Sequence, residues 1–179
     1  MKGIVMQLSS TMQTFILHWG EMGSRWGVNR TVAQIHALLY LAGEPLTAET
    51  ITETLGVARS NVSTSLRELQ SWGLVQVSQK LGDRRDYFAS QQDVWDIFMT
   101  IMEGRKQREL DPTLTTLRNC SVEGKEDSET PAEVQARIDD TLEFLEQLIE
   151  WYGQMKSVDR NTLIKLMKLG ARVQSLMGK

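Results

Sequence analysis

Apolar side chains recur every three or four residues over most of the chain, which predicts helices that each bury one face. One stretch departs from this spacing: LVQVSQ alternates with period two, with Val75 and Val77 on one face, and DYFAS has strand character. Together the two segments indicate a β-hairpin, with its tip near Leu81 to Arg84. The segments with helical spacing are 4–22, 30–41, 48–55, 59–72, 93–110, 113–120, 131–156 and 159–177.

Turn and cap residues mark where these helices begin and end. Thr47 is expected to cap the helix that ends at Gly56, and Gly73 to end the next helix. The segment GEMGSRWGVN contains three glycines and is expected to be a connection. The charged segment SVEGKEDSET has no apolar face and predicts a loop or a mobile linker.

The order helix, helix, helix, hairpin, helix predicts a fold that is mainly α with a small β-hairpin wing. This is a winged helix-turn-helix flanked by N- and C-terminal dimerisation helices. We expect an N-terminal helix in 1–27, a DNA-binding domain in 28–92 and a C-terminal helical region in 93–179, with a flexible linker near 121–131.

Composition excludes several other classes of protein. Two histidines and one cysteine make a metal site or a Cys/His catalytic pair unexpected, and the single cysteine fits a reducing cytoplasm. There is no glycine-rich phosphate loop and no nucleophile beside a base. We therefore expect a cytoplasmic protein that is not an enzyme, with no catalytic residues, no metal and no cofactor, and with no membrane association.

The net charge of −3 hides a local basic region. Residues 1–90 hold eight basic and seven acidic side chains, whereas residues 91–179 hold twelve and sixteen. Between Arg59 and Arg85 five basic residues face two acidic ones. A local excess of this kind suffices for phosphate contacts, because salt screens charges more than about 10 Å away.

The helix that starts near Arg59 has an outward face typical of DNA recognition. Its buried stripe is Val62, Leu66 and Leu69, and no outward side chain is acidic. Arginine and asparagine can pair with base edges, and small hydroxyl side chains allow close approach to the major groove. The candidate DNA-binding residues, including those of the hairpin, are Arg59, Ser60, Asn61, Ser63, Thr64, Arg67, Lys80, Arg84 and Arg85.

At the hairpin tip, Arg84 and Arg85 follow Asp83. An arginine on a wing can reach the minor groove, where narrow A·T tracts concentrate negative potential. Asp83 would hold one of the two guanidinium groups in place, while the other meets the groove or the phosphates. A solvated charged turn is the alternative interpretation.

Five groups of residues resemble the MarR superfamily of winged-helix regulators, and most closely its GbsR branch. They are Leu55-Gly56-Val57, Arg59 to Ser63, Leu66 to Leu69, Trp72 to Val75 and Gly82 to Arg85. The resemblance covers about residues 1–112. It implies a homodimeric repressor or activator that binds a double-stranded, inverted-repeat DNA operator. By the same resemblance, Asp83 supports the minor-groove Arg85.

Aromatic residues add a candidate effector site. Trp19, Trp26, Tyr40 and Trp95 lie on segments that can meet beside the winged domain. Aromatic faces attract quaternary ammonium groups, and the resemblance to the GbsR branch implies choline or glycine betaine as the effector. The alternative is that these side chains serve core packing.

A winged helix can also be a protein–protein interaction module that does not bind DNA. Such a module is expected to expose apolar or acidic residues on its third helix. This sequence places arginine, asparagine and hydroxyl residues there, which favours DNA.

Overall fold

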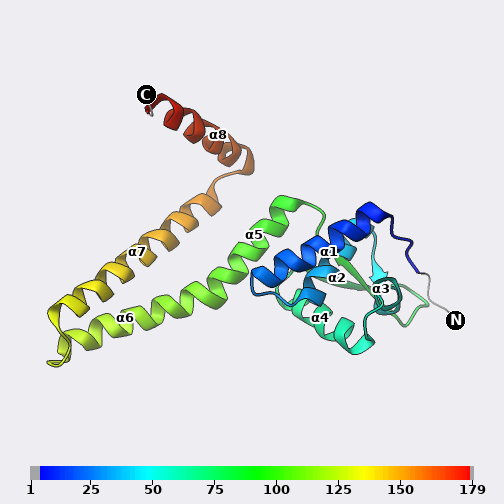
Figure 1. The fold of residues 1–179 in the computed structure, drawn as a ribbon, viewed down its shortest axis with the longest axis horizontal. Coiled ribbons are helices and arrows are strands. Elements are labelled where there is room, and N and C mark those ends of the chain that lie inside the picture. Colours follow the sequence, from blue (N-terminus) through cyan, green and yellow to red (C-terminus); the bar gives the residue numbers. More distant parts are fainter. Residues whose placement is uncertain (1–4, 178–179) are drawn as a thin grey trace. The chain divides into compact units, whose positions relative to one another are not determined.

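The computed structural model describes residues 5–177, with side chains for residues 5–169, and it divides into two compact units between Arg105 and Lys106. The first unit holds α1 (Ser10–Arg25), α2 (Arg30–Ala42), β1 (Leu46–Thr47), α3 (Ala48–Leu55), α4 (Arg59–Ser71), β2 (Val75–Gln79), β3 (Asp86–Ser90) and α5 (Val94–Arg105) (Figure 1). The second holds a π-helical turn (Lys106–Leu110), α6 (Asp111–Glu126), α7 (Ala132–Ser157) and α8 (Arg160–Met177). The predicted fold class, mainly α with a small β wing, is confirmed.

The first helix begins later than its apolar spacing predicted. Ser9 caps α1 by accepting a hydrogen bond from the backbone N–H of Met12 (3.3 Å). The preceding residues are not helical, because the Met6 backbone N–H donates to Thr54 Oγ1 of α3 (3.1 Å). Met6 and Leu8 pack against the core from this extended segment. Position 4, where the helix was expected to start, lies outside the described residues.

The expected connection over 20–29 is largely wrong, since α1 continues to Arg25. Gly20 and Gly23 are buried where α1 lies against α2. A Cβ on Gly23 would lie 2.6 Å from Ala33 Cβ, and one on Gly20 would lie 2.7 Å from Gln34 Cγ. The glycines therefore permit a close helix crossing instead of breaking the helix. The chain turns only at Gly27, whose φ is +77°.

The core of the first unit lies where α1, α2, α3, α4 and the sheet meet. It joins the predicted inner faces of α2, α3 and α4. Its most deeply buried side chains are Ile35, Leu38, Leu39, Ile51, Val62 and Leu66.

The three-stranded antiparallel sheet has the order β1-β3-β2. The short β1, which the sequence pattern did not predict, pairs Thr47 with Tyr87 of β3. In the hairpin, Val75 is buried but Val77 is 46% exposed, although both lie on one face of β2. Only the base of the hairpin reaches the core, so its outer half projects as the wing.

In the second unit α6 and α7 pack against each other. The helix α6 runs to Glu126, six residues into the segment expected to be a loop. Ser121 is buried and its hydroxyl donates to Asp139 Oδ1 of α7 (2.5 Å), while Gln135 Nε2 donates to the Ser121 carbonyl (3.1 Å). The small polar side chains that suggested a loop are therefore satisfied by the neighbouring helix.

Candidate nucleic-acid interface

The turn between α3 and α4 is built as a helix-turn-helix requires. Thr47 caps α3, because its Oγ1 accepts from the backbone N–H of Thr50 (3.2 Å). Gly56 ends α3 with a φ of +64°, and its N–H donates to the Thr52 carbonyl (3.0 Å). Only glycine adopts this left-handed conformation without strain, so the turn is as tight as the sequence predicted.

The outward face of α4 carries all the candidate DNA-binding residues that the sequence placed on this helix. Val62, Ser65, Leu66 and Leu69 form its buried stripe. On the other side seven side chains are exposed, and none of α4's residues is among the exposed large hydrophobic residues. They are the six predicted residues Arg59, Ser60, Asn61, Ser63, Thr64 and Arg67, together with Ser71 at the end of the helix.

Arg67 lies along the helix surface. Its Nε donates to the Ser63 carbonyl (3.4 Å) and its Nη2 to Thr64 Oγ1 (3.5 Å). Both contacts are long, so the guanidinium is restrained but remains exposed to a ligand.

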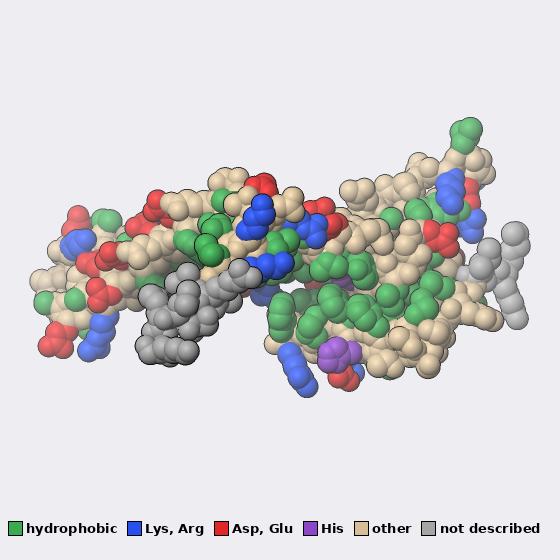
Figure 2. Space-filling view, turned by 90° about the horizontal axis from the view of Figure 1, so that it is seen from above, with side chains coloured by type: hydrophobic (Ala, Val, Ile, Leu, Met, Phe, Trp, Pro, Cys, Tyr) green, Lys and Arg blue, Asp and Glu red, His purple; other side chains and the backbone are tan. Residues whose placement is uncertain are grey.

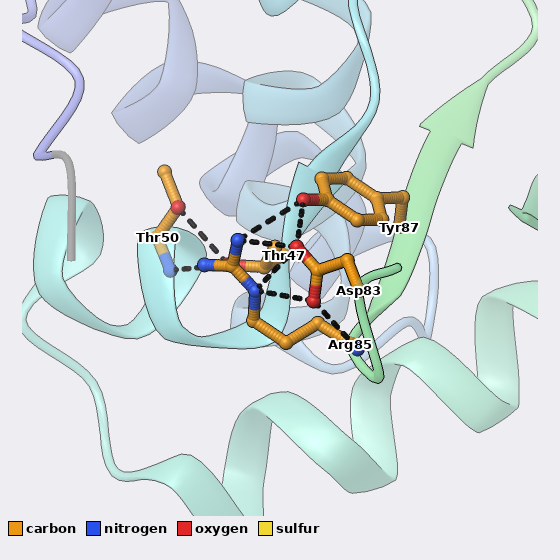
Figure 3. Close-up of polar contacts among 5 residues, drawn as sticks. All are labelled: Thr47, Thr50, Asp83, Arg85 and Tyr87. Carbon is orange, nitrogen blue, oxygen red and sulfur yellow. Dashed lines mark hydrogen bonds and ion pairs between the residues drawn. The ribbon is translucent and has the colours of Figure 1, made fainter. Parts of the chain in front are cut away.

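The wing holds one of its arginines in a polar cluster (Figure 3). Asp83 Oδ1 accepts from the backbone N–H and the Nε of Arg85 (both 3.0 Å). Asp83 Oδ2 accepts from Arg85 Nη2 (2.5 Å) and from the Tyr87 hydroxyl (2.8 Å). The sequence predicted the Asp83–Arg85 pair but not the part of Tyr87, which was expected only to lie in a strand.

These contacts fix the charges in the cluster. Hydrogen bonds from Arg85 hold the pKa of Asp83 well below its usual value. The same carboxylate, as a hydrogen-bond acceptor, raises the pKa of Arg85 and of Tyr87. Asp83 therefore stays ionised and Arg85 stays protonated, in a fixed orientation.

The other two basic residues of the wing differ in their surroundings. The Nζ of Lys80 lies 4.1 Å from the ring centroid of Tyr87, which is within the range of a cation–π contact. Arg84 is exposed next to the Asp83–Arg85 pair. The wing therefore presents one restrained and one solvent-facing guanidinium.

The recognition helix and the wing enclose a cleft of about 500 Å³, here called the basic cleft. It brings together Arg59, Ser63 and Arg67 of α4 with Arg84 and Arg85 of the wing. Of the other predicted residues, Ser60, Asn61, Thr64 and Lys80 are exposed but do not line it. Residues that the sequence reasoning missed complete its wall, namely Ala48, Glu49, Leu66, Gln70, Val77, Asp86 and Phe88.

Glu49 is the notable addition. Its Oε1 lies 2.6 Å from Arg59 Nη2, so a carboxylate of α3 holds the first residue of α4. In the sequence Glu49 is simply an acidic residue in a first helical turn, a common helix-stabilising position. The nine residues that separate it from Arg59 give no signal of the contact.

A second cavity, of about 310 Å³, lies on the other side of α4 and is here called the apolar cavity. Of the candidate effector residues, Trp19 and Trp26 line it, whereas Tyr40 and Trp95 do not. Tyr40 instead stacks on Phe15, with ring centroids 6.5 Å apart, and Trp95 contacts Phe98 (5.9 Å). Figure 2 shows the hydrophobic side chains that gather on one face of this unit.

The apolar cavity has one buried polar side chain in its wall. His36 is 4% exposed, and its Nε2 has no hydrogen-bond partner. Burial lowers the pKa of His36 to about 4, so the imidazole is neutral at pH 7. At the edge, Arg105 Nη2 donates to the Trp26 carbonyl (2.7 Å).

Neither a membrane-spanning helix nor a metal-binding cluster is present in the part of the chain that the structure describes. No helix within 5–177 has the length and apolar character needed to cross a bilayer. Among the same residues, no group of three or more His, Cys, Asp or Glu side chains is placed to hold a metal ion.

Comparison with known proteins supports the same fold. Residues 26–86 match the model of the MarR family. The Bacillus subtilis protein YvaV, whose name places it among HTH-type transcriptional regulators, is 20% identical over 141 residues, which are 78% of this chain and 80% of YvaV. The HTH-type transcriptional repressor GbsR of the same bacterium is 22% identical over 149 residues, 79% of this chain and 82% of GbsR.

A solved structure described as a transcriptional regulator is also similar. It has a TM-score of 0.61 at 17% sequence identity, over 80% of this chain and 94% of that one. All three of these proteins are transcriptional regulators by name. The helix-turn-helix and the wing of this chain are therefore similar to the MarR family, and its fold is similar to that of the solved regulator.

Proposed function

We propose that this protein is a transcriptional regulator that binds a specific sequence of double-stranded DNA. The observation that carries the proposal is the exposed, acid-free face of α4, which lies across the basic cleft from Arg84 and Arg85. A helix of this kind enters the major groove with its N-terminal residues toward the base edges. The names of YvaV and GbsR agree with this role.

Each part of the surface has its own task in this proposal. Asn61 and Arg67 read adenine and guanine edges, and the hydroxyls of Ser60, Ser63 and Thr64 allow close approach or bind phosphate. Arg85, oriented by Asp83, enters the minor groove or meets the backbone, while Arg84 and Lys80 contact phosphates. The rival interpretation is a protein-interaction module that does not bind DNA. It is disfavoured because α4 exposes no large hydrophobic side chain to a protein partner.

We further propose that the protein acts as a homodimer on an inverted repeat. One winged domain makes few base contacts, and pairing two half-sites is the usual remedy. On α7 the face that carries Asp139 and Glu146 contacts α6, with Glu146 Oε1 2.8 Å from Arg118 Nη2. A second stripe of α7 is exposed and apolar, at the helical spacing of Phe144, Leu148 and Trp151.

The dimer would cover this stripe with the same stripe of a second copy. GbsR is a repressor by name. We propose the same sign of regulation here, since a dimer seated on an operator blocks access to it.

For the effector we propose that a quaternary ammonium compound, such as choline or glycine betaine, occupies the apolar cavity. Trp19, Trp26 and Trp72 offer indole faces there, and Glu68 offers a carboxylate. Because His36 is neutral, it does not repel a cation. Titration of choline or glycine betaine against tryptophan fluorescence tests this, with a saturable change expected in the native protein and a weaker one in Trp26→Ala. An unchanged fluorescence would remove the effector proposal.

The main test of function is selection of bound sequences from a random DNA pool by the purified protein. We expect an enriched inverted repeat, with half-site centres about one helical turn apart or a multiple of it. A mobility shift with the enriched duplex then measures affinity. If selection yields no sequence preference, the proposal of specific DNA binding is wrong.

A further inference from the structure

Glu49 and Arg59 form an ion pair at the entrance of the recognition helix. Glu49 lies in the first turn of α3 and Arg59 is the first residue of α4. Their Oε1 and Nη2 atoms are 2.6 Å apart, and both residues line the basic cleft. The two helices of the helix-turn-helix are thus joined by side chains at the surface proposed to meet DNA.

Stability does not explain this pair. The Arg59 side chain is 69% exposed and that of Glu49 is 35% exposed. Ion pairs between such exposed groups contribute little to folding, because water solvates both partners. The pair does restrict the guanidinium, which otherwise samples many rotamers.

The position of Glu49 also opposes general attraction to DNA. Its carboxylate lies in a cleft whose wall holds Arg59, Arg67, Arg84 and Arg85. The other carboxylate in the lining, Asp86, accepts a hydrogen bond from Gln79 Nε2 (3.1 Å). A negative charge facing the duplex disfavours contact with any phosphate, whatever the sequence.

We propose that Glu49 is a specificity-determining residue that positions Arg59 for a base edge. One of the five N–H donors of Arg59 is engaged by Glu49, and the remaining donors can bind a guanine. Glu49 lowers affinity for all DNA through its charge and lowers the ordering cost of the one contact that reads sequence. The inference depends on the proposed role of α4 in DNA binding.

Two substitutions separate the charge of Glu49 from its positioning. Glu49→Gln removes the charge, and we expect it to raise affinity for random DNA by about threefold at moderate salt. It also leaves Arg59 able to contact a phosphate. The slope of the logarithm of affinity against the logarithm of salt concentration should therefore steepen by about one. Glu49→Asp keeps the charge but shortens the reach, so affinity for random DNA stays near that of the native protein.

Both variants are expected to lower the preference for the selected operator over random DNA by at least about fivefold. Glu53→Gln is the matched control, because it removes one charge from the same helix outside the basic cleft. Its preference is expected to match that of the native protein. Circular dichroism melts show whether each variant is folded at the assay temperature.

Selection from the random pool then identifies which bases are affected. Glu49→Gln and Arg59→Ala should lose preference at the same base pair, and the double variant should lose no more than Arg59→Ala alone. Loss at a different base pair overturns the inference, because Glu49 would then read a base itself. Equal weakening of operator and random DNA, or no change in either, also overturns it. Specific binding by the native protein, measured in the same assay, tests the proposed function separately.

Discussion

The basic cleft and the apolar cavity lie on opposite sides of one helix and differ in every property that decides what can bind. The cleft is open, with four arginines in its wall, whereas the cavity is lined by indoles, aliphatic side chains and a neutral imidazole. Salt weakens contacts in the first and has little effect on apolar contacts in the second. Ser63, Arg67 and Gln70 of α4 face the cleft, and Glu68, Leu69 and Trp72 face the cavity.

The comparison shows why α4 is suited to join two functions. Arg67 and Glu68 are neighbours in sequence, yet each lines a different site. A ligand in the apolar cavity would contact α4, the helix proposed to read DNA, directly and not through another helix or strand.

The largest effect is expected from Leu66→Ala, which removes the buried floor of the basic cleft. Leu66 is 2% exposed and belongs to the core shared by both sites. We expect the free energy of unfolding to fall by about 2–5 kcal/mol, measured by denaturant titration. Gln70→Ala, in the same cleft, is the control and should change it by less than about 0.5 kcal/mol. If Leu66→Ala lowered the free energy of unfolding by no more than Gln70→Ala does, the burial of Leu66 in the core would be contradicted.

The buried His36 in the wall of the apolar cavity is expected to make the stability of the protein depend on pH. Burial lowers the pKa of His36 to about 4 from 6.5, so the unfolded chain binds a proton first as the pH falls. The contribution of neutral His36 to the free energy of unfolding is fully present above pH 6.5. It is lost progressively as the pH falls toward 4, and the loss is at most about 3 kcal/mol.

His36→Leu should remove this part of the pH dependence in urea titrations between pH 7 and 4.5. His18→Gln, at an exposed position, should keep it. The described burial of His36 is wrong if both variants lose stability over that range as the native protein does.

Within the cleft, Arg67→Ala is expected to weaken the selected operator by about 1–3 kcal/mol, because a bidentate base contact is lost. Affinity for random DNA should change much less, and Arg67→Lys should not restore the preference, since lysine lacks the planar fork. Competition mobility shifts measure both affinities. A uniform loss on all DNA would instead make Arg67 a phosphate contact.

The wing is expected to contribute a smaller, sequence-independent effect. Arg84→Ala with Arg85→Ala should weaken all duplexes and reduce the salt slope by about one to two. Lys165→Ala with Lys168→Ala removes the same charge from α8 and serves as the control. Unchanged affinity and slope in the wing variant would exclude the wing from the interface.

The helix-turn-helix and its outward face could be predicted because the signals are local. Apolar spacing, the cap at Thr47 and the glycine at position 56 each depend on residues within one or two turns. The wing pair of Asp83 and Arg85 is local as well, two residues apart.

The sequence predictions that were wrong or missing concern residues whose structure depends on contacts distant in sequence. Gly20 and Gly23 lie within a helix where α2 packs against them, and the helical Ser121 donates a hydrogen bond from its hydroxyl to Asp139. Neither partner can be inferred from the periodicity of one segment. The same holds for Glu49, because its ion pair with Arg59 joins two helices across the turn.

The glycine crossing of α1 on α2 sets the smallest fragment that can be studied. The family match begins at Trp26, but that boundary would strip Ile16 and both close-packed glycines from the face of α2. A shortened version for spectroscopy must therefore begin ahead of Ser9, so that the first helix keeps its cap, and it can stop after Arg105. A fragment that starts at Trp26 would have an incomplete fold with part of its core exposed to solvent.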